Sequence, residues 1–294
     1  MDVYRLFKLM SDRSSHNKRI AKNTLFLYLR MGLVLVVSLF STRVVLQALD
    51  IEDYGINNVV SGFVTMFAFL NTSMSNGVQR FYNFSLGRKN GYSIKDVYNT
   101  ALQIQAILAV TLLVPLETFG MWYIHTQMVI PIDRFAAAQW VFQFSVLSLV
   151  LLVLQIPYSA AIMAYEKMDY YAYLSIFDVL AKLGIAYIIK YTTFDKLILY
   201  GALNMLVSLI CFFLYYGYAK SHFQDLKSDF IIRKQLFKPM LYFSGWNGFG
   251  SFAYMIKSQG LNMLLNVFFG PVVNAARGVS NMAMSAIQGF QSNI

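Results

Sequence analysis

The sequence predicts an all-α integral membrane protein. Of its 294 residues, 57% are hydrophobic and only 13% are charged, and the mean hydropathy is +0.52. Soluble domains are about a quarter charged, and a soluble chain of this size could not bury so much apolar surface. The hydrophobic residues fall in runs of about 20, the length of a helix that crosses a bilayer rather than of a barrel strand. These observations exclude a cytosolic enzyme, a disordered chain and, with a single cysteine, a disulfide scaffold.

Eight hydrophobic runs are candidates for these helices. The seventh is more polar than the others, and the eighth is still continuing at Ile294. The basic segment 220–238 follows the sixth run and marks a boundary between two bundles. We therefore predict an N-terminal segment at 1–23, a six-helix lobe at 24–219, a linker loop at 220–238 and an incomplete second lobe at 239–294. The eight runs are Thr24–Leu49, Asn58–Gln79, Val97–Tyr123, Phe135–Tyr158, Tyr170–Lys190, Leu197–Tyr218, Pro239–Asn266 and one that begins near Pro271.

Residues 1–23 are basic and have no apolar core or cleavage site of a signal peptide. Val3, Leu6, Phe7 and Met10 are spaced as on one face of a helix. This spacing predicts a short amphipathic helix on the inner membrane face. A frayed tail is the alternative, and both interpretations stay open.

The lysines and arginines predict the orientation. With the N-terminus inside, the inner segments carry six of them in 1–23, four in 80–95, one at Lys167 and five in 220–238. The outer loops carry three. This asymmetry places the N-terminus in the cytoplasm under the positive-inside rule. The first outer turn, residues 50–53, is acidic and is expected to cap the second helix and face water.

Three candidate helices carry a mostly polar stripe along one face, because its members recur at steps of three and four. Small polar residues can simply join helices, and this interpretation stays open. For three full-length stripes that contain Asn, Gln and Arg, we favour a hydrated cavity lined by the first, second, seventh and eighth helices. The stripes are Asn58, Ser61, Thr65, Ala68, Thr72, Ser75 and Gln79; Asn247, Ser251, Tyr254, Ser258, Asn262 and Asn266; and Arg277, Asn281, Ser285, Gln288 and Ser292.

Charged residues also occur within the predicted spans. Asp178 and Lys182 are four residues apart, so they can pair on one helix face, either as a neutral structural pair or as an ion-coupling site. Arg30 lies deep in the first helix, whereas Arg43 is near its outer end and can reach the headgroups. Basic residues that face one cavity suit an anionic substrate. The substrate-binding candidates are Arg30, Arg43, Asn58, Asn247, Lys257, Asn262 and Arg277.

The sequence lacks the usual signatures of an enzyme. It has no Walker loop and no Gly-x-Ser-x-Gly motif, and its three histidines are isolated without metal-ligand spacing. We therefore expect no enzymatic activity, no catalytic residues, no metal and no cofactor.

Six short segments form a set of motifs: NTL at 23–25, STRVVL at 41–46, DYGINNVV at 53–60, QRF at 79–81, SGWN at 244–247 and NVFFGPVVNAARG at 266–278. These segments resemble bacterial polysaccharide flippases, the exporters of O-antigen or capsule repeat units in the multidrug/oligosaccharidyl-lipid/polysaccharide (MOP) superfamily. The resemblance implies a MATE-like architecture of two six-helix lobes around a basic cavity that opens alternately to each side. It implies a polyprenyl-pyrophosphate-linked oligosaccharide as substrate, location in the bacterial inner membrane among its lipids, and contacts with other polysaccharide assembly proteins but not with nucleic acid. Against that architecture the chain holds one lobe and the first one to two helices of the second, as a truncated protein would.

Two other functions remain as alternatives. One is a cation-coupled multidrug exporter of the same superfamily, although cationic drugs favour carboxylates over basic residues. The other is a membrane-embedded polysaccharide polymerase or acyltransferase, which needs a general base or nucleophile on an accessible loop. The short outer loops, poor in histidine, offer little for such an enzyme.

Overall fold

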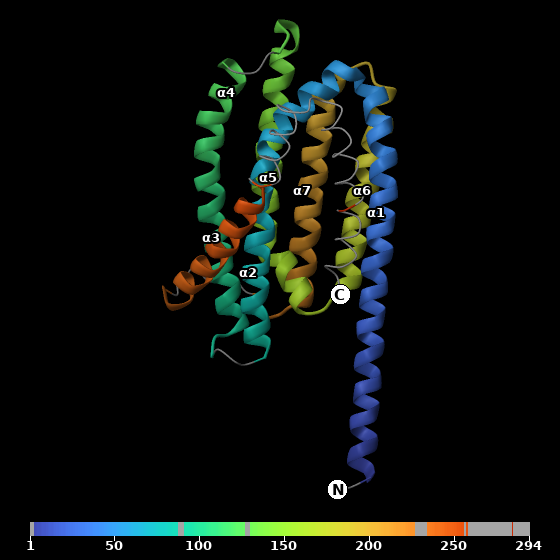
Figure 1. Ribbon diagram of the computed structural model, residues 1–294, viewed down its shortest axis with the longest axis vertical. Coiled ribbons are helices and arrows are strands. Elements are labelled where there is room, and N and C mark those ends of the chain that lie inside the picture. Colours follow the sequence, from blue (N-terminus) through green and yellow to red (C-terminus); the bar gives the residue numbers. More distant parts are fainter. Residues whose placement is uncertain are drawn as a thin grey trace.

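The computed structural model describes residues 3–87, 91–126, 130–226, 234–255, 257 and 284, and this part of the chain is a bundle of long helices without strands (Figure 1). Five stretches are long and apolar enough to cross a membrane: Thr24–Asp50, Ile94–Thr126, Ile132–Ala164, Met168–Lys190 and Lys196–His222. The predicted all-α membrane fold is therefore confirmed. The elements are α1 (Val3–Thr65), η1 (Met66–Ala68), α2 (Phe69–Leu86), α3 (Ile94–Pro115), η2 (Leu116–Gly120), α4 (Met121–Thr126), η3 (Ile132–Arg134), α5 (Phe135–Ala164), α6 (Met168–Lys190) and α7 (Lys196–His222), followed by a helix at 234–255.

The course of α1 corrects two predictions. The chain is helical from Val3 onward and runs without a break into the first span, so residues 3–23 form neither a separate short helix nor a frayed tail. The expected turn at 50–53 is a single residue, because only Asp50 leaves helical geometry, with φ 64° and ψ 167°. The helix resumes at Ile51, well before Asn58, where the second helix was predicted to begin.

Three apolar clusters hold the helices together. On α1 the buried residues Val44, Val45, Ala48 and Leu49 recur at helical spacing and pack on α6 and α7. A second cluster joins the later part of α1 to α3 and α5 around Phe142, and a third joins α2, α3, α5 and α7. The opposite face of α1 exposes large apolar residues, as a lipid-facing surface does: Leu25, Leu29, Val36, Leu39 and Phe40.

Stacked rings join α5, α6 and α7 at the end of the bundle where the N-terminus lies (Figure 1). The rings of Tyr165 and Phe223 have centroids 4.1 Å apart, and those of Tyr170 and Tyr218 are 3.6 Å apart. Burial and the nearby Asp225 carboxylate raise the pKa of Tyr165 to about 12. Tyr165 therefore stays protonated at neutral pH, and its hydroxyl donates to Asp225 Oδ2 at 3.5 Å.

The arrangement makes the predicted orientation testable. The α5–α6 turn and the end of α7 lie at the same end as the N-terminus, and the α6–α7 connection lies at the opposite end (Figure 1). Tyr191 in that connection is 79% exposed, and Gln224 beyond α7 is exposed at the N-terminal end. In a Cys211→Ala background, an impermeant maleimide added outside intact cells is expected to label Tyr191→Cys but not Gln224→Cys. The opposite pattern would invert the topology.

Candidate functional site

An open groove lies between α2 and the helix at 234–255, with a volume of about 730 Å³. Two of the predicted stripes meet here, because Thr72 belongs to one and Asn247, Ser251 and Tyr254 belong to the other. The structure thus brings these residues together, while their role in binding stays a prediction. The groove is lined by Phe69, Thr72, Trp246, Asn247, Gly250, Ser251, Tyr254 and Met255.

Small residues set the position of the two helices beside this groove. Ser73 Oγ donates to the Ser244 carbonyl oxygen at 2.7 Å, and both residues are buried. Gly77 faces Ser244, and Gly248 faces Ser73 from the other helix. The small residues are spaced by four on each helix, which lets the two backbones approach closely. The groove opens next to this crossing.

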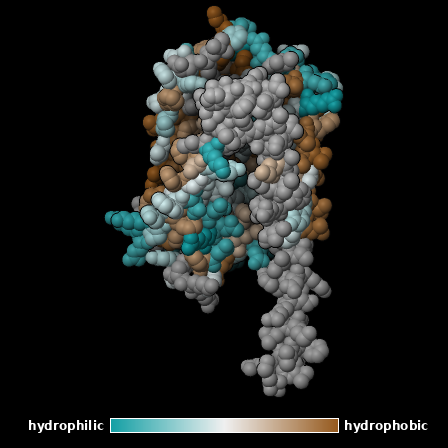
Figure 2. Space-filling model, in the orientation of Figure 1, coloured by the Kyte–Doolittle hydropathy of each residue, from teal (hydrophilic) through white to brown (hydrophobic). Residues whose placement is uncertain are grey.

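Arg80 was predicted to lie in the inner loop at 80–95, but it lies on α2. It is exposed, and its guanidinium carbon lies 4.1 Å from the ring centre of Phe243 and 5.2 Å from that of Phe84. Aromatic faces hold a guanidinium by cation–π attraction and leave its N–H edge available. Hydrophilic residues gather over the lower part of α2 in Figure 2. The exposed polar residues of this helix include Thr72, Asn76, Arg80 and Asn83.

Arg30 belongs to α1, and its side chain contacts α6. Its guanidinium donates from one terminal nitrogen to Ser175 Oγ at 3.3 Å and lies 4.9 Å from the ring centre of Tyr171. Its Nε is buried without a hydrogen-bond partner. Arg30 therefore contacts the fifth predicted span, which was not among the helices expected to line the cavity.

Asp178 and Lys182 form the predicted ion pair, with 2.8 Å between Asp178 Oδ2 and Lys182 Nζ. Ser175 precedes Asp178 by three residues, so Arg30 approaches the same face of α6. Three charged side chains thus share one region of the lobe, and whether the pair couples transport to an ion stays a prediction.

The other candidates lie apart from these contacts. Arg43 and Asn58 are exposed on α1, and Lys257 is exposed beyond the groove. Asn262 and Arg277 lie outside the described residues. Within the described ranges no group of three or more His, Cys, Asp and Glu side chains could hold a metal ion.

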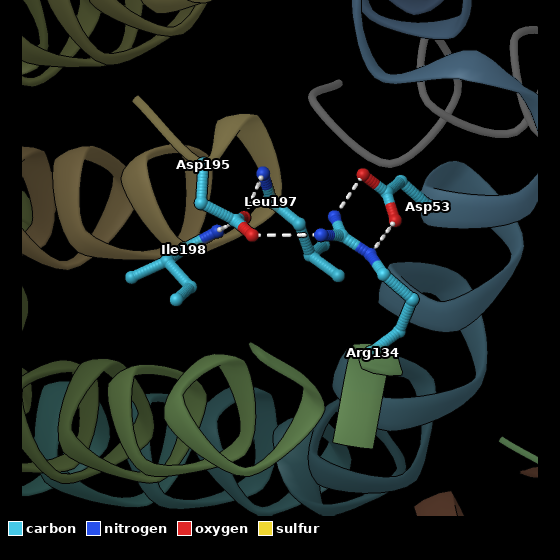
Figure 3. Close-up of polar contacts among 5 residues, drawn as sticks. All are labelled: Asp53, Arg134, Asp195, Leu197 and Ile198. Carbon is cyan, nitrogen blue, oxygen red and sulfur yellow. Dashed lines mark hydrogen bonds and ion pairs between the residues drawn. The ribbon is translucent and has the colours of Figure 1, made fainter. Parts of the chain in front are cut away.

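A network at the end of the bundle opposite the N-terminus was not anticipated (Figure 3). Arg134 donates from Nε to Asp53 Oδ1 at 2.7 Å, pairs through a second nitrogen with Asp53 Oδ2, and donates to Asp195 Oδ2 at 2.7 Å. The other oxygen of Asp195 caps α7 by accepting from the amides of Leu197 and Ile198 at 3.0 Å. One guanidinium thereby joins α1, the start of α5 and the start of α7.

Replacing Arg134 with alanine is expected to lower the thermal stability of the purified protein. The change leaves the carboxylates of Asp53 and Asp195 without their shared cation, and a hydrogen bond to a charged group contributes about 1.5–3 kcal/mol. Partial exposure reduces this figure. The melting temperature of Arg134→Lys should lie between those of the native protein and Arg134→Ala, since lysine keeps the charge and loses the bidentate geometry. Lys190→Ala, an exposed residue at the same end, is the control, and a melting temperature for Arg134→Ala equal to that of the control would contradict the prediction.

Solved structures that match this fold include MATE and other MOP superfamily transporters. No family model and no curated protein matches the sequence. A multidrug resistance MATE family transporter of the MOP superfamily, in an outward-facing conformation, superposes with a TM-score of 0.75 over 93% of this chain at 12% identity. A MOP superfamily transporter from Pyrococcus furiosus, described by the reverse polarity of its binding pocket, gives 0.66 over 93% at 13% identity. A MATE structure in complex with Br-NRF gives 0.62 over 94% at 13% identity.

The chain therefore has a MATE-like fold, that of multi-pass membrane proteins. It spans 63% of the length of the first two structures and 65% of the third. The match corresponds to part of that fold, in agreement with the predicted architecture of one lobe and the beginning of a second.

Proposed function

We propose that this chain belongs to a transporter that moves polyprenyl-pyrophosphate-linked oligosaccharides across the bacterial inner membrane by alternating access, with its N-terminus in the cytoplasm. The fold supports a transport role, and the signature segments described above support the substrate class. The observation that carries the proposal is the position of Arg80, a basic residue on the exposed polar face of α2 that leads to the groove.

Arg80 suits a pyrophosphate for a physical reason. A guanidinium can donate two parallel hydrogen bonds to phosphate oxygens, and its hydration shell is weaker than that of an ammonium group. The rings of Phe84 and Phe243 hold the guanidinium in place before the ligand arrives. Less conformational entropy is then lost on binding. The basic candidates Arg30, Arg43, Lys257 and Arg277 are proposed to add positive potential along the path.

The distribution of carboxylates favours an anionic substrate over a cationic drug. Glu117 and Asp178 lie well inside the described spans; Glu117 accepts from Gln143 Nε2 at 2.9 Å, and Asp178 pairs with Lys182. Cation-coupled multidrug export remains the second candidate, because two of the matching structures are described as a multidrug transporter and as a MATE structure with Br-NRF. A polymerase or acyltransferase has no such structural neighbour among them.

Transport in vesicles tests the proposal. Membrane vesicles that contain the protein are expected to translocate a radiolabelled polyprenyl-pyrophosphate-linked oligosaccharide and to leave ethidium, a cationic drug, untransported. Arg80→Ala should abolish most of the translocation, and Arg80→Lys should retain part of it, since the lysine loses the planar donor edge. Lys190→Ala is the matched control at the opposite end of the bundle. Ethidium transport without oligosaccharide transport would favour the multidrug function.

A further inference from the structure

Three aromatic residues, Phe69, Trp246 and Tyr254, form an aromatic wall of the groove. Binding of pyrophosphate at Arg80 does not explain this wall. Trp246 is 69% exposed and Phe249 is 65% exposed, although both lie inside a helix. Their rings stack, with centroids 5.9 Å apart and planes at 22°. Phe69 and Phe252 lie nearby, 5.6 Å apart. The stack with Phe249 restrains the indole of Trp246, which lines the groove and can receive a ligand.

Polar groups stand beside this wall. Asn247 donates one Nδ2 hydrogen to the Phe243 carbonyl oxygen at 3.1 Å, so its amide oxygen and its second N–H remain for a ligand. Thr72 and Ser251 add hydroxyl groups. A small number of polar groups among apolar and aromatic ones is the usual composition of a small-molecule site.

The chemistry of the lining selects the class of ligand. None of its described residues is charged, so a phosphate or a cation would be bound there without a counter-charge. A purely hydrocarbon chain would leave the amide and hydroxyl groups unpaired. A sugar ring is uncharged and matches the lining in two ways. Its axial C–H groups form an apolar face for the aromatic rings, and its hydroxyls form a polar edge for the amide and hydroxyl groups.

We infer that this groove binds a neutral sugar ring, stacked on Trp246 and hydrogen-bonded by Asn247. The inference rests on the proposed function, which supplies a saccharide as substrate, and the lining of the groove selects a neutral sugar ring. Thr72 and Arg80 are eight residues apart on α2, about 12 Å at 1.5 Å per residue. One lipid-linked saccharide can therefore place its pyrophosphate at Arg80 and a sugar in the groove.

Tryptophan fluorescence tests the groove separately from transport. The chain has three tryptophans, so the background Trp122→Phe/Trp140→Phe leaves Trp246 as the reporter. The protein is placed in lipid nanodiscs, because detergents with sugar headgroups would compete. The probes are neutral methyl glycosides of glucose, galactose, mannose and N-acetylglucosamine, with inorganic pyrophosphate for comparison.

At least one glycoside is expected to shift the Trp246 emission saturably, and pyrophosphate is not. Asn247→Ala should raise the Kd for that glycoside about tenfold, because one hydrogen bond to the ligand is lost. Tyr242→Ala should leave it unchanged, since Tyr242 is 77% exposed on the same helix and outside the groove. The inference is overturned if no glycoside gives a saturable shift, if pyrophosphate gives the same shift, or if Asn247→Ala has no effect.

The two proposals fail in different experiments. Glycoside binding without oligosaccharide transport would remove the flippase function and keep the sugar site. Transport without glycoside binding would keep the flippase function and remove the sugar site. In transport, Trp246→Phe should retain activity that Trp246→Ala loses, because phenylalanine keeps an aromatic face.

Discussion

Asp178→Asn is expected to destabilise the protein more than Lys182→Met does. The two residues form an ion pair of 2.8 Å on α6, and Arg30 approaches the same face through Ser175. Removal of the carboxylate leaves two cations near each other, whereas removal of the lysine leaves Asp178 with Arg30 in its vicinity. A charge at the centre of a membrane helix costs about 2.5–3.5 kcal/mol on insertion scales. Partial exposure of both side chains makes this an upper figure.

The double variant separates a structural pair from a coupling site. Asp178→Asn/Lys182→Met should melt closer to the native protein than Asp178→Asn alone, because no unpaired charge remains on α6. A structural pair predicts that the double variant recovers transport along with stability. An ion-coupling pair predicts recovered stability without transport. Native melting temperatures for both single variants would show that the pair contributes to neither.

Gly77→Leu is expected to disrupt the crossing of α2 with the helix at 234–255. A Cβ at Gly77 would overlap Ser244 Oγ and lie 3.2 Å from Ser244 Cβ and 3.5 Å from its Cα. Rotation of the serine side chain can move its Oγ but not its Cβ, whose 3.2 Å contact is already tight. The further carbons of a leucine therefore push the two helices apart. Overpacking of this kind costs about 1–3 kcal/mol, and separation also breaks the Ser73–Ser244 hydrogen bond.

Smaller changes at the crossing provide the controls. Gly77→Ala should lower the melting temperature by a smaller amount, and Ser244→Gly in the same chain should restore part of it by removing the serine Cβ and Oγ that the added methyl group meets. Gly217→Ala on α7 is the matched control, because nothing lies within 4 Å of the added Cβ. If Gly77→Leu were as stable as Gly217→Ala, the close contact between Gly77 and Ser244 would not contribute to stability.

Features that lie along one helix were predictable from the sequence, and so was the approach of two polar stripes at the groove. The specific side-chain contacts between helices were not. The spans follow from hydropathy, and the Asp178–Lys182 pair follows from spacing along one helix. The Arg134 network joins residues 81 and 61 positions apart, a separation that no local pattern encodes. Arg80 was missed because its second aromatic neighbour, Phe243, comes from a distant helix. The turn at 50–53 was predicted too long, because its acidic residues are typical of a loop, whereas only Asp50 leaves the helix.

The single-residue turn at Asp50 bears on how the chain enters the bilayer. The first span, Thr24–Asp50, is apolar enough to insert by itself, whereas the stretch from Ile51 to Leu86 is not among the five such helices in the described part of the chain. Polar groups raise the free energy of partitioning from the translocation channel into lipid. Because Asp50 alone separates the two segments, we expect the second segment to leave the channel together with the first, as a helical hairpin. Biogenesis of this lobe would then depend on the hydrophobicity of Thr24–Asp50 for two helices rather than one.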